Sequence, residues 1–92
     1  MGTQFRTVGI FSNETDELMT ISLEVTCEEI RMSPGDEIEL LAEDNDEHFP
    51  MNILYHKDGL QIYPRFGSTE WKFRYNGKVY EADWPSILSD LK

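Results

Sequence analysis

Several features that often identify a protein class are scarce in this sequence. Cys27 is the only cysteine, so no internal disulfide can form, as expected for a protein of a reducing compartment. No apolar run approaches the roughly 20 residues that a membrane-spanning helix needs. The first residues also lack the apolar stretch of a secretion signal. We therefore expect a cytoplasmic protein that makes no membrane contact.

Motifs for catalysis and for metal or cofactor binding are missing as well. The sequence has no glycine-rich phosphate loop and no paired-histidine metal motif. Cys27 is followed by Glu28 and Glu29, whose charges disfavour a thiolate, so we expect a buried or half-buried structural cysteine. Residues 44–48 are rich in oxygen ligands, but the spacing departs from that of a calcium-binding loop. We predict a protein that is not an enzyme and uses no metal or other cofactor.

Positive charge is scarce in the first half of the chain. Residues 1–50 hold thirteen acids and two bases, whereas residues 51–92 hold five acids and six bases. Between residues 14 and 47 the only cation is Arg31, and the formal net charge of the whole chain is −10. Such a field repels nucleic acid and anionic membranes and attracts basic proteins. The alternative is that the acidity serves solubility only.

The apolar residues that are present suffice for one core. They make up 39% of the chain, with 12% aromatic residues, and 92 residues are too few for two cores, so we expect a single domain over residues 1–92. Residues 18–26 alternate strictly between apolar and polar side chains, which predicts a half-buried strand. Further strands are predicted by similar patterns, at residues 5–11, 51–56, 60–65, 70–75 and 78–82. In the strand at 70–75 we expect the aromatic side chains to face the core.

Turn and helix signals complete the predicted fold. Lys57-Asp58-Gly59 and Asn76-Gly77 are hairpin turns by their composition. A capping-box pattern predicts a helical turn over residues 27–32, and residues 85–91 predict a short C-terminal helix. Residues 34–43 fit a helix or a strand, and we favour the strand. The predicted class is α+β, mainly β, with about six antiparallel strands, the C-terminal helix and one or two helical turns.

The carboxylates of the first half are the candidate binding residues. Their crowding opposes folding through self-repulsion, and no lysine relieves it. On a strand, Glu37 and Glu39 would stand about 6.6 Å apart on one face. That spacing matches alternate phosphates of a DNA strand, which follow each other about every 3.4 Å. The predicted acidic surface comprises Glu14, Asp16, Glu17, Glu24, Glu28, Glu29, Asp36, Glu37, Glu39, Glu43, Asp44, Asp46 and Glu47.

In size, in its acidic block from Glu14 to Glu47 and in its lack of catalytic motifs, the chain resembles the small acidic DNA-mimic proteins of phages. It is most similar in character to the Arn-type antirestriction proteins, which inhibit the modified-cytosine-dependent restriction nuclease. The resemblance implies an inhibitor in the host cytoplasm whose acidic surface occupies the DNA site of a basic nuclease. That surface can extend across a homodimer. The inhibitor itself would not bind nucleic acid. Two alternatives remain open: an immunity or antitoxin protein that plugs a nuclease, and an adaptor domain that is acidic for solubility.

Overall fold

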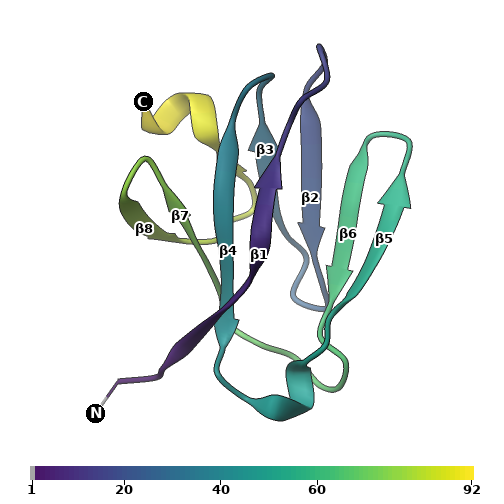
Figure 1. Ribbon diagram of the computed structural model, residues 1–92, viewed down its shortest axis with the longest axis vertical. Helices are drawn as coiled ribbons and strands as arrows, with labels where there is room; N and C mark the ends of the chain where they lie inside the picture. Colours follow the sequence, from purple (N-terminus) through teal and green to yellow (C-terminus); the bar gives the residue numbers. More distant parts are fainter. Residues whose placement is uncertain (1) are drawn as a thin grey trace.

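Two β-sheets make up most of the protein in the computed structural model, which describes residues 2–92 (Figure 1). The first sheet has the strand order β1 (Phe5–Ser12), β4 (Glu37–Glu43), β7 (Trp71–Tyr75) and β8 (Lys78–Glu81). The second sheet has the order β5 (Asn52–His56), β6 (Gly59–Tyr63), β2 (Met19–Leu23), β3 (Glu28–Met32) and β9 (Ser86–Ile87). Two short 3₁₀ helices are η1 (Asp46–His48) and η2 (Leu88–Leu91).

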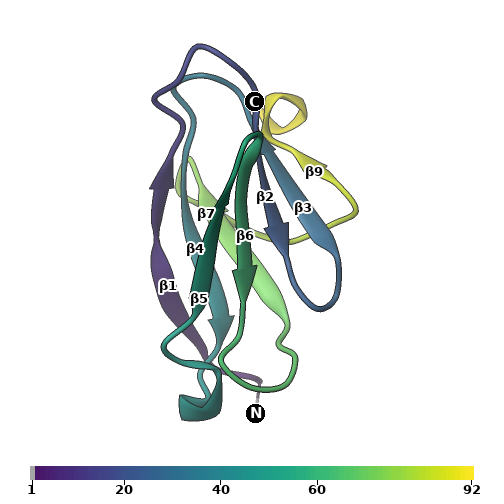
Figure 2. The same cartoon turned by 90° about the vertical axis from the view of Figure 1, so that its right-hand side faces the viewer.

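The two sheets face each other as layers, and the core lies between them (Figure 2). Alternation of apolar and polar side chains supplies each inner face. From the second sheet come Ile21 and Leu23 of β2, and from the first come Trp71 and Phe73 of β7, all at most 1% exposed. The prediction that the aromatic side chains of residues 70–75 face the core is therefore confirmed.

The mainly β class is confirmed, but the prediction of about six antiparallel strands is wrong. The described residues form nine strands, and β2 pairs with β6, and β3 with β9, in parallel. The strand predicted at residues 18–26 ends at Leu23, because the chain turns over the next four residues and returns as β3. A chain that crosses between two layers can bring distant strands together in parallel, which local periodicity does not reveal.

Both predicted helical segments are extended or 3₁₀ instead. Residues 27–32, where the capping-box pattern predicts a helical turn, contain the strand β3 instead. Every second residue of β3 is buried, so Glu28, Ile30 and Met32 point inward. Cys27 takes a left-handed conformation with φ of 66°. The predicted C-terminal helix is the short strand β9 followed by η2. Leu88 is fully buried there, so packing against the core overrides the local helical spacing.

Residues 34–43 fit a helix or a strand by their sequence, with the strand favoured, and in the structure they contain the strand β4. Gly35, with φ of 86°, forms the preceding turn, and Ile38 and Leu40 then alternate inward as a strand requires. The Asn76-Gly77 hairpin is also confirmed: both residues have positive φ, 50° and 82°, as a tight primed turn demands.

Candidate functional site

The predicted acidic residues are divided among three places in the fold. One group gathers at the end of the molecule where β1 turns into β2. The backbone of Asn13 bonds to Gly35 and Asp36, which ties the β1–β2 loop to the start of β4. This brings together four exposed carboxylates, here called the β1–β2 cluster: Glu14, Asp16, Glu17 and Glu37. No ion pair joins any of the four to a cation among residues 2–92.

A second group lies at the opposite end of β4 and is here called the β4–β5 cluster: Glu43, Asp44, Asp46 and Glu47. Arg6 pairs with Asp44 at 2.7 Å and with Asp46 at 2.6 Å, and these bonds raise the pKa of its guanidinium. The carboxylate of Glu43 accepts from the backbone N–H of Glu70 at 2.7 Å. The cluster is therefore partly neutralised, and Glu47 is its exposed member without an ion pair in the described chain.

Glu39 stands between the two clusters on β4. Its carboxylate accepts hydrogen bonds from the Thr7 hydroxyl and from the guanidinium of Arg74, and these bonds lower the pKa of Glu39, the Thr7 bond most strongly. From Glu37 to Glu43 the strand spans about 20 Å. The two clusters and Glu39 thus form a line along β4, with Arg74 as a counter-charge at its middle.

The third group lies on the second sheet and does not join the other two. Glu24 accepts from the Gln61 amide at 3.1 Å, and Glu29 pairs with Arg31 at 3.3 Å. Glu28 points inward from β3, and only 7% of it is exposed. The two-sheet topology therefore separates residues that are neighbours in the sequence.

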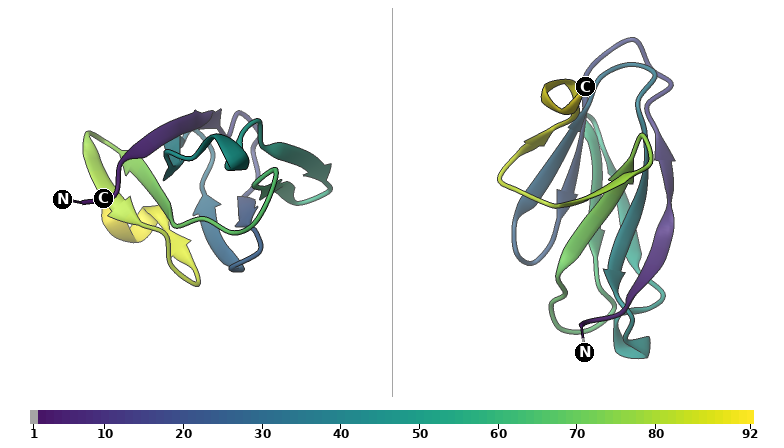
Figure 3. Two further views of the ribbon diagram at one scale, coloured as in Figure 1. Left: turned by 90° about the horizontal axis from the view of Figure 1, so that it is seen from below. Right: turned by 90° about the vertical axis from the view of Figure 1, so that its left-hand side faces the viewer.

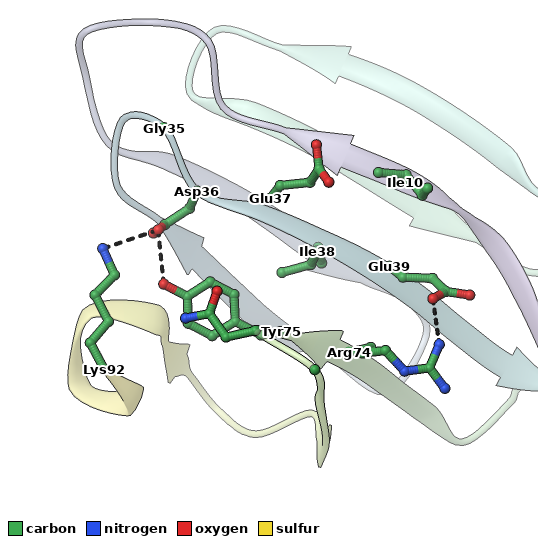
Figure 4. A pocket seen from close by; sticks show the side chains of 11 residues that line it. Ile10, Gly35, Asp36, Glu37, Ile38, Glu39, Arg74, Tyr75 and Lys92 are labelled. Atoms are coloured by element: carbon green, nitrogen blue, oxygen red, sulfur yellow. Dashed lines mark hydrogen bonds and ion pairs between the residues drawn. The ribbon is translucent and has the colours of Figure 1, made fainter.

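Asp36 is also buried, in a network that the sequence did not reveal (Figure 4). Its carboxylate accepts from the Tyr75 hydroxyl at 3.0 Å and from the backbone N–H of Ser33 at 2.8 Å, and the ammonium of Lys92 lies 3.2 Å away. Burial raises the pKa of Tyr75, and the bond to Asp36 raises it further. The same carboxylate raises the pKa of Lys92. Nothing in the local sequence marks Tyr75 and Lys92 as partners of Asp36.

A groove of about 560 Å³ opens over this network, between the start of β4 and the β7–β8 turn (Figure 4). Ile10 and Ile38 give it apolar surface, and charged side chains of both signs border it, among them Glu37 and Arg74. Its buried carboxylate, that of Asp36, is already paired with the Tyr75 hydroxyl and the half-exposed Lys92 ammonium. The groove offers shape and polarity for binding. Its one hydroxyl bonded to a carboxylate belongs to Tyr75, which is buried and whose pKa is raised, so it is a poor nucleophile.

The prediction of a buried or half-buried cysteine is wrong, because Cys27 is exposed in the β2–β3 turn. The turn needs a left-handed residue at that position, and this places the side chain outside the sheet contacts. Within residues 2–92, no set of three or more His, Cys, Asp or Glu side chains is arranged to hold a metal ion. No helix in the same part of the chain is long and apolar enough to cross a membrane.

No protein-family model, curated protein or solved structure matches this chain.

Proposed function

We propose that the protein is a non-enzymatic inhibitor that presents an acidic, DNA-like surface to a basic DNA-binding protein, with a host restriction nuclease as the first target to test. The proposed surface consists of the β1–β2 cluster, Glu39 and the β4–β5 cluster. Glu28 and Asp36 are left out of it because both are buried. Glu24 and Glu29 are left out because they belong to the other sheet.

The observation that carries the proposal is the line of carboxylates along β4. It follows the strand for about 20 Å, the length of about six phosphate spacings on one DNA strand. At both ends of this line are exposed acids that no cation within residues 2–92 neutralises. This surface carries an excess of carboxylates over its two cations, Arg74 at the middle and Arg6 at one end, and such an excess along a row favours a partner that binds a row of phosphates.

The dimensions of the molecule support the same reading. Its extents are 37 × 28 × 20 Å, and one turn of duplex DNA is about 34–36 Å long. A duplex of that length carries about 20 phosphates. The formal net charge of the chain is −10, so its net negative charge is about half that of such a duplex.

The matching experiment measures DNA cleavage by the modified-cytosine-dependent restriction nuclease in the presence of the protein. One variant reverses Glu14, Asp16 and Glu17 to Lys. The matched control reverses Asp58, Asp83 and Asp90, which are exposed and lie outside the proposed surface, so that the net charge changes equally. We expect inhibition by wild type and by the control, and strongly weakened inhibition by the first variant.

Equal weakening by both variants would show that net charge alone matters and that the placement of the β1–β2 cluster does not. If the wild type leaves cleavage unchanged, that nuclease is not the target. Proteins captured from a host lysate and released by graded salt then supply the next partners to test. A captured nuclease blocked in its active site, while still bound to DNA, would favour the immunity-type alternative.

A further inference from the structure

The strand β5 is an unprotected sheet edge. It ends the second sheet and pairs with β6 only, so its other row of backbone N–H and C=O groups has no strand partner in the described chain. In the end-on view of Figure 3 the β5–β6 hairpin projects at one side of the molecule. All five residues of β5 are exposed, whereas β6 beside it alternates between buried and half-buried positions.

The other three sheet edges carry features that prevent further pairing. β1 has a bulge between Thr7 and Gly9, β8 carries Lys78 and Glu81, and β9 is only two residues long. Bulges, charged side chains and short strands are the usual means by which proteins protect an edge. β5 has none of these features. It is five residues long, its register with β6 shows no bulge, and its sequence Asn-Ile-Leu-Tyr-His contains no Lys, Arg, Asp, Glu or Pro.

We propose that β5 is the contact through which two copies of this chain pair, edge to edge and antiparallel. Residues 48–56 form the longest stretch of the chain without a Lys, Arg, Asp or Glu. In a protein of net charge −10, that stretch is where a second copy can approach with the least repulsion. The second copy also presents the row of free backbone groups that the edge requires.

The side chains of β5 are self-complementary in such a pair. A two-fold axis at Leu54 places Ile53 of each copy opposite Tyr55 of the other, on the face that also carries Ile62 and Leu60 of β6. Pairs of an aromatic and a β-branched residue are among the stabilising cross-strand pairs. Leu54, Ile53 and Tyr55 are 46%, 43% and 87% exposed in the single chain, and pairing would cover part of each.

This inference does not depend on the proposed function, and salt separates the two. Screening reduces the repulsion between two chains of charge −10, so self-association should strengthen as salt rises, whereas a complex with a basic partner should weaken. The test is sedimentation equilibrium of the full chain from about 1 μM to about 1 mM, the range of weak specific complexes. We expect the mass to rise from 10.8 kDa towards twice that value.

The control uses an edge of the other sheet. Leu54→Lys places two cations face to face and should raise the dissociation constant at least about tenfold. Val79→Lys on the edge strand β8, at a position 49% exposed, makes the same charge change and should leave it unaltered. Mixing Leu54→Lys with Leu54→Glu should restore the dimer, because the two side chains then attract.

Amide hydrogen exchange of the wild type provides a measurement that needs no variant. The β5 amides on the free edge should exchange more slowly as the protein concentration rises, and those of β8 should not change. A chain that stays monomeric over the whole range, or slower exchange at β8 in place of β5, would overturn the proposal. Loss of the dimer in Leu54→Lys without rescue by Leu54→Glu would overturn the Leu54-centred register.

Discussion

The Asp36 network gives a prediction about which acidic residue the fold needs. Asp36→Ala removes the acceptor of the Tyr75 hydroxyl and of the Ser33 N–H, and Tyr75 is only 3% exposed. A buried polar group left without a partner destabilises by about 1–3 kcal/mol. The loss of the Lys92 pair adds little, because that ammonium is half exposed. We expect a total loss of about 3–4 kcal/mol in the free energy of unfolding.

Tyr75→Phe should cost less, about 1–2 kcal/mol, because Ser33 and Lys92 still bond to the Asp36 carboxylate. Once Tyr75 has become Phe, Asp36→Ala no longer leaves a hydroxyl unpaired. The double variant should therefore be less destabilised than the sum of the two single variants, by about 1–2 kcal/mol. Glu37→Ala, next in sequence but exposed, is the control and should change stability by less than about 0.5 kcal/mol.

Equilibrium unfolding in urea, followed by tryptophan fluorescence, measures these differences, because unfolding exposes the buried Trp71 whereas Trp84 is already exposed. With a slope of about 1–3 kcal/mol per molar urea, Asp36→Ala should lower the midpoint by at least about 1 M. Stability within about 0.5 kcal/mol of wild type, or strict additivity of Asp36→Ala and Tyr75→Phe, would refute the view that Asp36 is a structural residue.

Three further predictions concern pH, the thiol and salt. The pKa of Glu39 is lowered in the folded protein, so Glu39 contributes stability above the ordinary glutamate pKa of about 4.3. That contribution is lost as the pH falls through the folded pKa. Glu39→Gln should therefore flatten the acid dependence of the urea midpoint, measured from about pH 7 to pH 3. Cys27→Ser should leave inhibition intact and unfolding within about 0.5 kcal/mol of wild type, since Cys27 is exposed, and an inactive but folded variant would restore thiol chemistry as a hypothesis. Affinity for the basic partner should fall steeply between about 50 and 500 mM salt, because exposed charges are screened beyond about 10 Å already at 0.1 M. A constant affinity would indicate an apolar interface instead.

Local patterns predicted much of the sheet structure. The alternation in β2 and the Asn76-Gly77 turn could be recognised because both signals depend on neighbouring residues. The strand β3 was mistaken for a helical turn, because a capping pattern is visible locally whereas the inward packing of Ile30 between two sheets is not. The parallel pairing of β9 with β3 depends on contacts more than fifty residues apart and has no local signal.

For the candidate site, the sequence indicated the excess of acid but not its arrangement. Glu28 and Glu29 are adjacent in the sequence, yet strand alternation buries the first and leaves the second beside Arg31. In the sequence Asp36 cannot be distinguished from its exposed neighbour Glu37, and only the fold brings the Tyr75 hydroxyl against the Asp36 carboxylate. Charge counts therefore overstate the acidic surface wherever the fold turns a carboxylate inward.

Competition with DNA tests the central proposal most directly. The partner is held at fixed concentration with labelled duplex DNA, and the protein is titrated in at constant salt. DNA mimicry predicts that the protein displaces the DNA completely and that the protein alone binds no DNA. Reversal of Glu14, Asp16 and Glu17 to Lys should weaken this displacement far more than reversal of the control residues does. A ternary complex, in which the partner holds DNA and this protein together, would contradict the proposal.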